Sequence, residues 1–198
     1  ISTFYNFANQ RFRKIEITTH FGIAAYKAEQ MCLVINARTS GAVGGMDTHG
    51  DHDIQHPLCI DEIVEQIDAL VTDLKEMGVY DDSVIVVGSD MGRTPQYNSF
   101  NGKDHWPITS MLLLGGRVQG NQVIGETTDL LEAKKVDPQT LELSENGIEL
   151  TYPDMHQLFR RYSGIENTAV SKKYDLKAQE LNITKFFKKF FITSSNYD

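Results

Sequence analysis

The residues best suited to chemistry are concentrated in the stretch 44–56, which holds three histidines, three aspartates and three glycines. Imidazole nitrogens and carboxylate oxygens are common ligands of zinc and of harder divalent ions such as manganese. Glycine lets the backbone turn tightly, so that neighbouring side chains can converge. Asp47 and His49 are therefore candidate metal ligands. The alternative is a capped turn, in which the aspartate accepts backbone N–H groups and the histidine is packed or solvated.

Two later loops carry residues that could complete the same site. Asp90 and Arg93 lie in the first loop, and Asp104 and His105 lie in the second. We interpret Asp90, Asp104 and His105 as further candidate ligands, although Asp104 could instead hold the neighbouring imidazole in place. The planar guanidinium of Arg93 suits the paired oxygens of a phosphate or sulfate group. The alternative for Arg93 is a salt bridge to Asp90 or Asp104.

Other polar residues near these loops show weaker patterns. His52, Asp53 and His56 could add ligands, but a solvated loop residue or a neighbour of a helix start is the more ordinary interpretation. Lys103 could face an anion or simply be solvated. The sequence has no GxSxG elbow, no P-loop and no GxGxxG motif, and no nucleophile stands out among the hydroxyl groups near the predicted site.

The composition is that of a globular protein, since 40% of the 198 residues are hydrophobic and 23% are charged. The net charge of −8 argues against binding to nucleic acid or to an anionic membrane surface. It does not exclude a small anionic substrate, because a metal can reverse the local field. No apolar run approaches the ~20 residues of a membrane span. Cys32 and Cys59 are expected to be buried free thiols, with a disulfide as the alternative. Because the chain starts at Ile1, we expect a fragment of a longer protein.

A few predicted elements must position these residues. Three apolar runs predict strands, at 32–36, 83–88 and 111–114. Residues 57–77 show the clearest helical periodicity, and Gly78 is suited to end that helix. The order strand, helix, strand, loop, strand predicts a parallel or mixed sheet with helices on its faces. Ligands bind beyond the carboxyl ends of the strands in such sheets, where Asp47 and Asp90 would then lie.

The second half of the chain carries further signals. Residues 91–109 are predicted to form one long, ordered loop, and residues 122–125 a short edge strand. Asn146-Gly147 suggests a hairpin, and Pro153 is suited to start a helix. The aromatic run 186–191 is expected to dock as a helix or a strand against another part of the protein.

Several motifs occur in an order that resembles a known family. They are Gly44–His49, Gly78–Pro95, Asn101–Pro107, Gly115-Gly116 and Val123–Gly125. The chain closely resembles the bacterial family called domain of unknown function fifteen-oh-one, which looks like a branch of the alkaline phosphatase and sulfatase superfamily. The resemblance covers roughly residues 40–165 and leaves 166–198 as a tail.

This resemblance implies an α/β fold, a three-layer α/β/α sandwich with a central, mostly parallel sheet. Residues 1–198 would form a single domain, the carboxy-terminal part of a larger one. The resemblance also implies zinc or manganese ions, often a pair, that stabilise the attacking and leaving oxygens of a phosphate or sulfate ester. Asp47 and His49 would bind one ion, Asp90 would lie at the second, and His105 would close the site. Family members often carry a twin-arginine export signal, which implies a periplasmic or otherwise exported protein.

Two features depart from the superfamily pattern. Met91 stands where metal-rich members commonly have a histidine, so one metal position is expected to be weak or lost. The nucleophile, normally in the amino-terminal half of the fold, is not found. The first hypothesis is an exported metal-dependent hydrolase of phosphate or sulfate esters, with Arg93 holding the ester and His105 binding a metal or protonating the leaving group. The second is a catalytically reduced relative that binds a ligand or partner, such as a polysaccharide or another exported protein. The sequence does not separate a hydrolase from a phosphomutase-type transferase.

Overall fold

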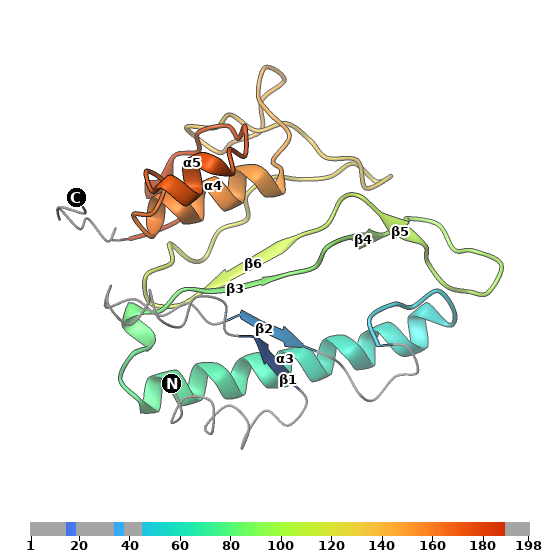
Figure 1. Cartoon of the computed structure of the whole chain (residues 1–198). Coiled ribbons are helices and arrows are strands. Elements are labelled where there is room, and N and C mark those ends of the chain that lie inside the picture. Colours follow the sequence, from blue (N-terminus) through green and yellow to red (C-terminus); the bar gives the residue numbers. More distant parts are fainter. Residues whose placement is uncertain (1–14, 19–33, 38–44, 189–198) are drawn as a thin grey trace. The chain divides into compact units, whose positions relative to one another are not determined.

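The structure, a computed structural model, describes residues 15–18, 34–37 and 45–188 (Figure 1). The strands are β1 (Ile15–Thr18), β2 (Val34–Ala37), β3 (Ile85–Gly88), β4 (Gly92–Arg93), β5 (His105–Trp106) and β6 (Met111–Leu114). The helices are α3 (His52–Glu76), α4 (Tyr152–Tyr162) and α5 (Ala169–Lys173), with short 3₁₀ turns η1 (Tyr80–Asp82) and η2 (Ile183–Lys185). The chain divides into two compact units. The first is Ile1–Asp73 with Gln96–Asp104, and the second is Leu74–Pro95 with His105–Asp198.

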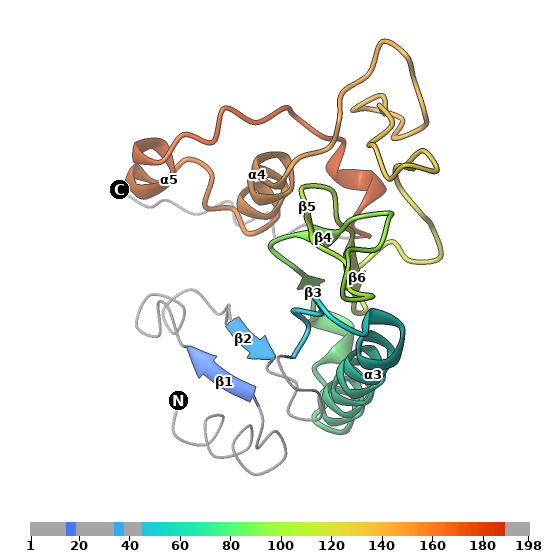
Figure 2. The ribbon, with the colours of Figure 1, turned by 90° about the vertical axis from the view of Figure 1, so that its right-hand side faces the viewer.

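The described strands form three antiparallel sheets of two strands each. β1 pairs with β2 (Figure 2), β3 with β6, and β4 with β5. The predicted three-layer α/β/α sandwich with a central, mostly parallel sheet is therefore wrong, and so is the simpler prediction of a parallel or mixed sheet. The physical reason lies in the connection between β3 and β6. Parallel neighbours need a crossover, usually a helix, whereas the segment 89–110 contains only the β4–β5 pair and returns directly.

The strands β3, β4, β5 and β6 are successive parts of one long hairpin whose tip, Gln96–Asp104, belongs to the first unit. Arg93 lies opposite His105 in the β4–β5 ladder. Residues 91–109 were predicted as one loop because two-residue strands are too short to show an alternating pattern. The expectation that this segment is ordered is consistent with Trp106, whose indole N–H donates to the carbonyl of Leu131 at 2.8 Å.

The predicted strands agree with the structure to different degrees. β6 covers the predicted residues 111–114, β3 begins two residues inside the predicted 83–88, and β2 overlaps the predicted 32–36 from Val34 onward. The prediction of an edge strand at 122–125 is wrong, since none of these residues lies in a strand.

Helix α3 begins at His52, so the predicted start at Pro57 is wrong and Pro57 lies inside the helix. The carbonyl of Asp51 accepts the N–H of Ile54 at 3.0 Å, which closes the first turn, and the N–H of Asp51 donates to Phe100 at 3.1 Å. The helix start is therefore fixed by pairing with a loop distant in sequence, which local periodicity does not reveal.

The predicted end of α3 at Gly78 is confirmed. Gly78 has a φ of +70°, in the left-handed region that glycine adopts without steric cost. Its N–H donates to Lys75, and the N–H of Val79 donates to Leu74, both at 3.0 Å. These two bonds form a Schellman motif, which satisfies the last carbonyls of the helix.

The second unit contains the main hydrophobic core of the described residues. Its buried side chains are Val118, Leu141, Met155, Leu158, Tyr162, Leu181, Phe186 and Phe187. The predicted helix near Pro153 is confirmed as α4, which starts one residue earlier. The carboxylate of Asp154 accepts both the N–H and the hydroxyl of Thr151, at 2.8 and 2.6 Å, and thereby caps this helix.

The aromatic segment at the end of the described chain docks onto this core. Phe187 is 1% exposed, stacks on Tyr162 with ring centroids 4.0 Å apart, and forms a β-bridge with Val118. The predicted hairpin near Asn146-Gly147 corresponds to a turn in which Gly147 N–H donates to Ser144 at 2.9 Å.

Two further sequence expectations concern the thiols and the membrane. Cys59 is a buried thiol, as predicted, and its sulfur donates to the carbonyl of Gly45 at 3.3 Å. Cys32 lies outside the described residues. Among the described helices, none combines the length and the apolarity needed to span a membrane.

Candidate metal centre

The loop before α3 holds the first pair of predicted ligands side by side. His49 Nδ1 lies 3.0 Å from Asp47 Oδ1, and the His49 N–H donates to the Asp47 carbonyl at 2.9 Å. The two side chains are 42% and 58% exposed, respectively, so a solvated ion could reach them. The pair therefore has the donor set of a zinc or manganese site.

The residue between them, Thr48, anchors this loop. Thr48 is 1% exposed, and its hydroxyl lies 2.7 Å from His52 Nδ1 and 3.4 Å from His56 Nδ1. The rings of His52 and His56 stack with centroids 4.5 Å apart. Both imidazoles are thus on the first turns of α3, directed at a buried hydroxyl, which favours a structural role over the alternative of additional ligands.

Asn98, at the tip of the long hairpin, connects this loop to Asp104. Its Nδ2 donates to the carbonyl of His49 at 3.0 Å and to Asp104 Oδ1 at 2.9 Å. Its Oδ1 accepts the N–H groups of Phe100 at 2.9 Å and Gly102 at 3.0 Å. The side chain of Asn98 therefore links three parts of the first unit: the backbone of His49, the side chain of Asp104, and the turn of residues 98–102.

Gly102 packs directly against the ligand loop. A Cβ at this position would lie 1.9 Å from the carbonyl carbon and oxygen of His49, so only glycine fits. The neighbouring Lys103 donates its N–H to the carbonyl of Thr48 at 3.2 Å. Its ammonium group lies 5.0 Å from the ring centre of Tyr97, within range of a cation–π contact.

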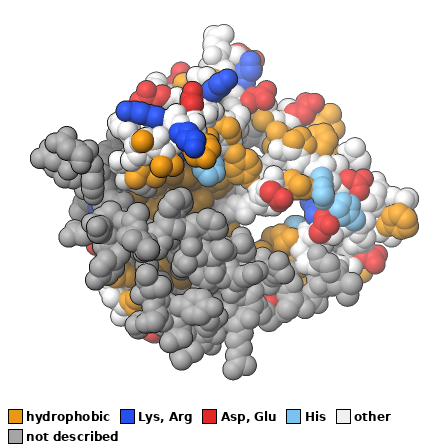
Figure 3. Space-filling view, viewed as in Figure 1, with side chains coloured by type: hydrophobic (Ala, Val, Ile, Leu, Met, Phe, Trp, Pro, Cys, Tyr) orange, Lys and Arg blue, Asp and Glu red, His pale blue; other side chains and the backbone are white. Residues whose placement is uncertain are grey.

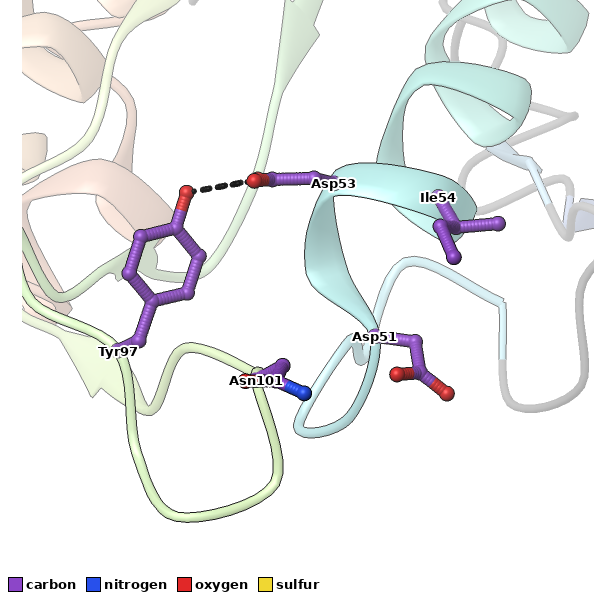
Figure 4. Close-up of a pocket in the computed structure, with 5 residues that line it drawn as sticks. All are labelled: Asp51, Asp53, Ile54, Tyr97 and Asn101. Carbon is purple, nitrogen blue, oxygen red and sulfur yellow. Dashed lines mark hydrogen bonds between the residues drawn. The ribbon is translucent and has the colours of Figure 1, made fainter.

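A hollow of about 310 Å³ lies beside these loops in the first unit, lined by Asp51, Asp53, Ile54, Tyr97 and Asn101. The Tyr97 hydroxyl donates to the carboxylate of Asp53, 2.8 Å from both oxygens (Figure 4). This hydrogen bond raises the pKa of Tyr97, with smaller contributions from desolvation and from the charge of Asp53. The hollow carries the carboxylates of Asp51 and Asp53, so it suits hydroxyl-rich or cationic groups better than anions.

Histidine and acidic side chains gather visibly near the start of α3 and the hairpin tip (Figure 3). The two elements are joined by a bridge between Gly50 and Asn101, in which the N–H of His52 donates to Asn101 at 2.9 Å. The first unit therefore holds Asp47 and His49 on one loop and Asp104 on another, and the side chain of Asn98 is hydrogen-bonded to both loops.

Asp90 lies in the second unit, beyond the carboxyl end of β3 as predicted. The Ser89 hydroxyl lies 3.5 Å from its Oδ1 and donates to the Met91 carbonyl at 2.9 Å. Tyr152, the first residue of α4, donates its hydroxyl to the Ser89 carbonyl. Burial raises the pKa of Tyr152, and the nearby charge of Asp90 raises it further.

Arg93 and His105 also belong to the second unit, where they are direct cross-strand partners. Side chains that are paired in this way lie about 5 Å apart at Cβ. The sequence interpretation of Arg93 as an oxygen-holding cation and of His105 as a ligand or acid is compatible with this pairing.

Sequence reasoning missed Asn98 and the Asp53–Tyr97 hydrogen bond. Asn98 carries a usable signal, because an asparagine whose side chain accepts N–H groups two and four residues later is typical of a tight turn. The Asp53–Tyr97 contact joins residues 44 positions apart and has no local signal.

Comparison with known families gives a match over most of the chain. The model of a family described as "Protein of unknown function (DUF1501)" matches residues 21–178. No curated protein and no solved structure matches the chain.

Proposed function

We propose that this chain, which belongs to the DUF1501 family, is a metal-dependent hydrolase of phosphate or sulfate esters that acts after export from the cytoplasm. The chemistry proposed is that of the alkaline phosphatase and sulfatase superfamily, which the ordered motifs resemble. The proposal concerns this chemistry and not the parallel sandwich of that superfamily, which the described strands do not form.

The observation that carries the proposal is the Asp47–His49 pair. A carboxylate oxygen and an imidazole nitrogen lie 3.0 Å apart on an exposed loop whose backbone is held by Thr48 and Asn98. A site that holds two ligand side chains in this way loses little conformational entropy when an ion binds. This argues for a binding role over a simple capped turn.

The remaining roles extend from this pair. Asp47 and His49, in the first unit, are the proposed ligands of one divalent ion, and His105 is retained as a further proposed ligand from the sequence motif. Asp90 is the proposed ligand of a second ion, and Asp104, whose Oδ1 is held by Asn98, supports the site or binds through its other oxygen.

The proposed reaction chemistry follows from these groups. When bound, divalent ions would polarise the ester and stabilise charge on the attacking and leaving oxygens. The guanidinium of Arg93 would hold two ester oxygens through parallel N–H donors. His105, opposite Arg93 in the ladder, is the alternative proton donor to the leaving group if it does not bind an ion.

A second function, ligand binding without turnover, is favoured by two observations. Met91 follows Asp90 where a further metal ligand would be expected, and thioether sulfur is a poor ligand for zinc or manganese. The acidic hollow around Asp53 and Tyr97 could bind a hydroxyl-rich ligand such as a polysaccharide. This function would require at most one tightly held ion.

The deciding experiment is metal analysis of the purified protein combined with turnover of aryl phosphate and aryl sulfate. One or two tightly held zinc or manganese ions together with turnover support the hydrolase. A bound ion without turnover supports the ligand-binding alternative. No retained ion and no turnover after metal addition would refute the proposal.

Matched variants assign the site. His49→Ala and Asp47→Asn should each lower the bound metal, whereas His156→Ala and Asp51→Asn should not. His156 is an exposed histidine of α4. Asp51 lies four residues from Asp47 but has a φ of +43°, which asparagine tolerates equally well.

A further inference from the structure

We infer that Asn98 is the positioning residue of the metal centre, the side chain that fixes the ligand loop and the Asp104 carboxylate relative to each other. The inference rests on the proposed function, because it needs an ion to be bound there. It concerns a residue with no ligating or acid–base chemistry of its own.

The hydrogen bonds of Asn98 use the full capacity of its amide. An asparagine side chain has two N–H donors and two acceptor lone pairs, and Asn98 makes four bonds, all between 2.9 and 3.0 Å. The orientation of the amide follows from its partners. Two of them are oxygens, which need the nitrogen, and two are backbone N–H groups, which need the oxygen.

These bonds act on the predicted ligands from two directions. The bond to the His49 carbonyl holds the backbone that carries the imidazole. The bond to Asp104 Oδ1 restricts the rotamer of this carboxylate. Outer partners of this kind typically change metal affinity by about 10- to 100-fold when removed.

An aspartate at position 98 separates positioning from folding. The carboxylate of Asn98→Asp can still accept the N–H groups of Phe100 and Gly102, so the turn itself is kept. Its second oxygen would face the His49 carbonyl and Asp104 Oδ1 with no proton to donate. The two acceptor contacts then become repulsive.

The added charge needs its own control, because a new carboxylate attracts cations. Asn101→Asp provides it. Asn101 lies on the same hairpin tip, lines the hollow and has a φ of +53°, a conformation that aspartate also tolerates. Both variants have the same net charge, so their difference reports the hydrogen bonds of Asn98.

The test is titration of Mn²⁺ and of Zn²⁺ into the metal-free protein by calorimetry, for the wild type and both variants. We expect Asn98→Asp to bind about 10- to 100-fold more weakly than Asn101→Asp. Substitution of Co²⁺ adds a spectroscopic readout, in which the visible absorption band of Asn98→Asp should differ from those of the wild type and Asn101→Asp. A merely structural residue would change the thermal stability of the metal-free protein but would leave the affinity and the band of the folded protein unchanged.

The outcomes keep the two ideas apart. Equal affinities and equal Co²⁺ bands for Asn98→Asp and Asn101→Asp, with metal bound by the wild type, would overturn the positioning role and leave the metal centre intact. A wild type that binds neither Mn²⁺ nor Zn²⁺ would overturn both.

Discussion

Replacing Gly102 with alanine should open the loop that carries the proposed ligands. The new Cβ would lie 1.9 Å from the carbonyl carbon and oxygen of His49. Non-bonded carbon atoms approach to about 3.5–4.0 Å, so one of the two backbones must move by more than an ångström. Because both atoms in conflict belong to the backbone, rotation of a side chain does not relieve the clash.

The cost can be estimated from the hydrogen bonds that such a movement breaks. Two bonds cross this contact, Lys103 N–H to Thr48 at 3.2 Å and Asn98 Nδ2 to His49 at 3.0 Å, and a third, Gly102 N–H to Asn98 at 3.0 Å, lies beside it within the hairpin tip. At a net value of about 0.5–1.5 kcal/mol each, the loss of all three costs about 1.5–4.5 kcal/mol.

Amide hydrogen exchange measures this local cost directly. The exchange of the Lys103 amide should accelerate by about 10-fold to 1,600-fold in Gly102→Ala, since about 1.4 kcal/mol corresponds to a factor of ten. Gly50→Ala is the matched control in the same loop, because its Cβ would meet only the Phe100 carbonyl at 3.8 Å, an ordinary contact. Similar exchange in the two variants would refute the close approach of the two loops. Metal affinity should fall with Gly102→Ala and stay near the wild-type value with Gly50→Ala.

Two further predictions concern the second unit. Phe187→Ala should lower the free energy of unfolding by about 3–5 kcal/mol in urea, because it removes a side chain that is 1% exposed and stacked on Tyr162. Phe100→Ala, at a position 74% exposed, should change it by less than about 0.5 kcal/mol, and equal effects would contradict the core described above. The N–H groups of Thr140 and Gln139 lower the pKa of Asp137, so its charge stabilises the fold above about pH 4 and this contribution is lost as pH falls through the lowered pKa. Asp137→Asn keeps the acceptor oxygen without the charge. The melting temperature of this variant should therefore lie below that of the wild type at pH 7 and approach it near pH 3. A difference in melting temperature that does not change with pH would contradict a stabilising role of the Asp137 charge.

Local signals in the sequence were sufficient for elements that depend on neighbouring residues. Gly78 ends α3 because a left-handed residue is needed there, and α4 starts beside Pro153 with an aspartate cap. β6 was predicted to the residue because an apolar run ends at two glycines. In each case the physical cause lies within a few positions of the element.

The direction of strand pairing could not be predicted in the same way. Apolar runs at 83–88 and 111–114 are equally compatible with parallel and antiparallel neighbours. What decides between them is whether the intervening segment crosses over or returns. Here it returns through the short β4–β5 ladder, whose two-residue strands leave no pattern in the sequence.

The candidate site shows the same contrast: the proposed ligands can be predicted from the sequence, but the residues that hold the ligand loop in place cannot. Asp47, His49 and Asp104 were predicted as ligands from residue type and spacing, because metal chemistry restricts which side chains can serve. Asn98 and Gly102 were not, although the geometry of the ligand loop depends on them. Asparagine and glycine are common in turns, so their presence predicts a turn. It does not show which other loop that turn contacts. The loop at 44–56 therefore has the composition of a metal site, while its shape depends on a hairpin tip about 50 residues further along the chain. Substitution of Asn98 or Gly102 at that tip should weaken metal binding, although neither residue is a proposed ligand.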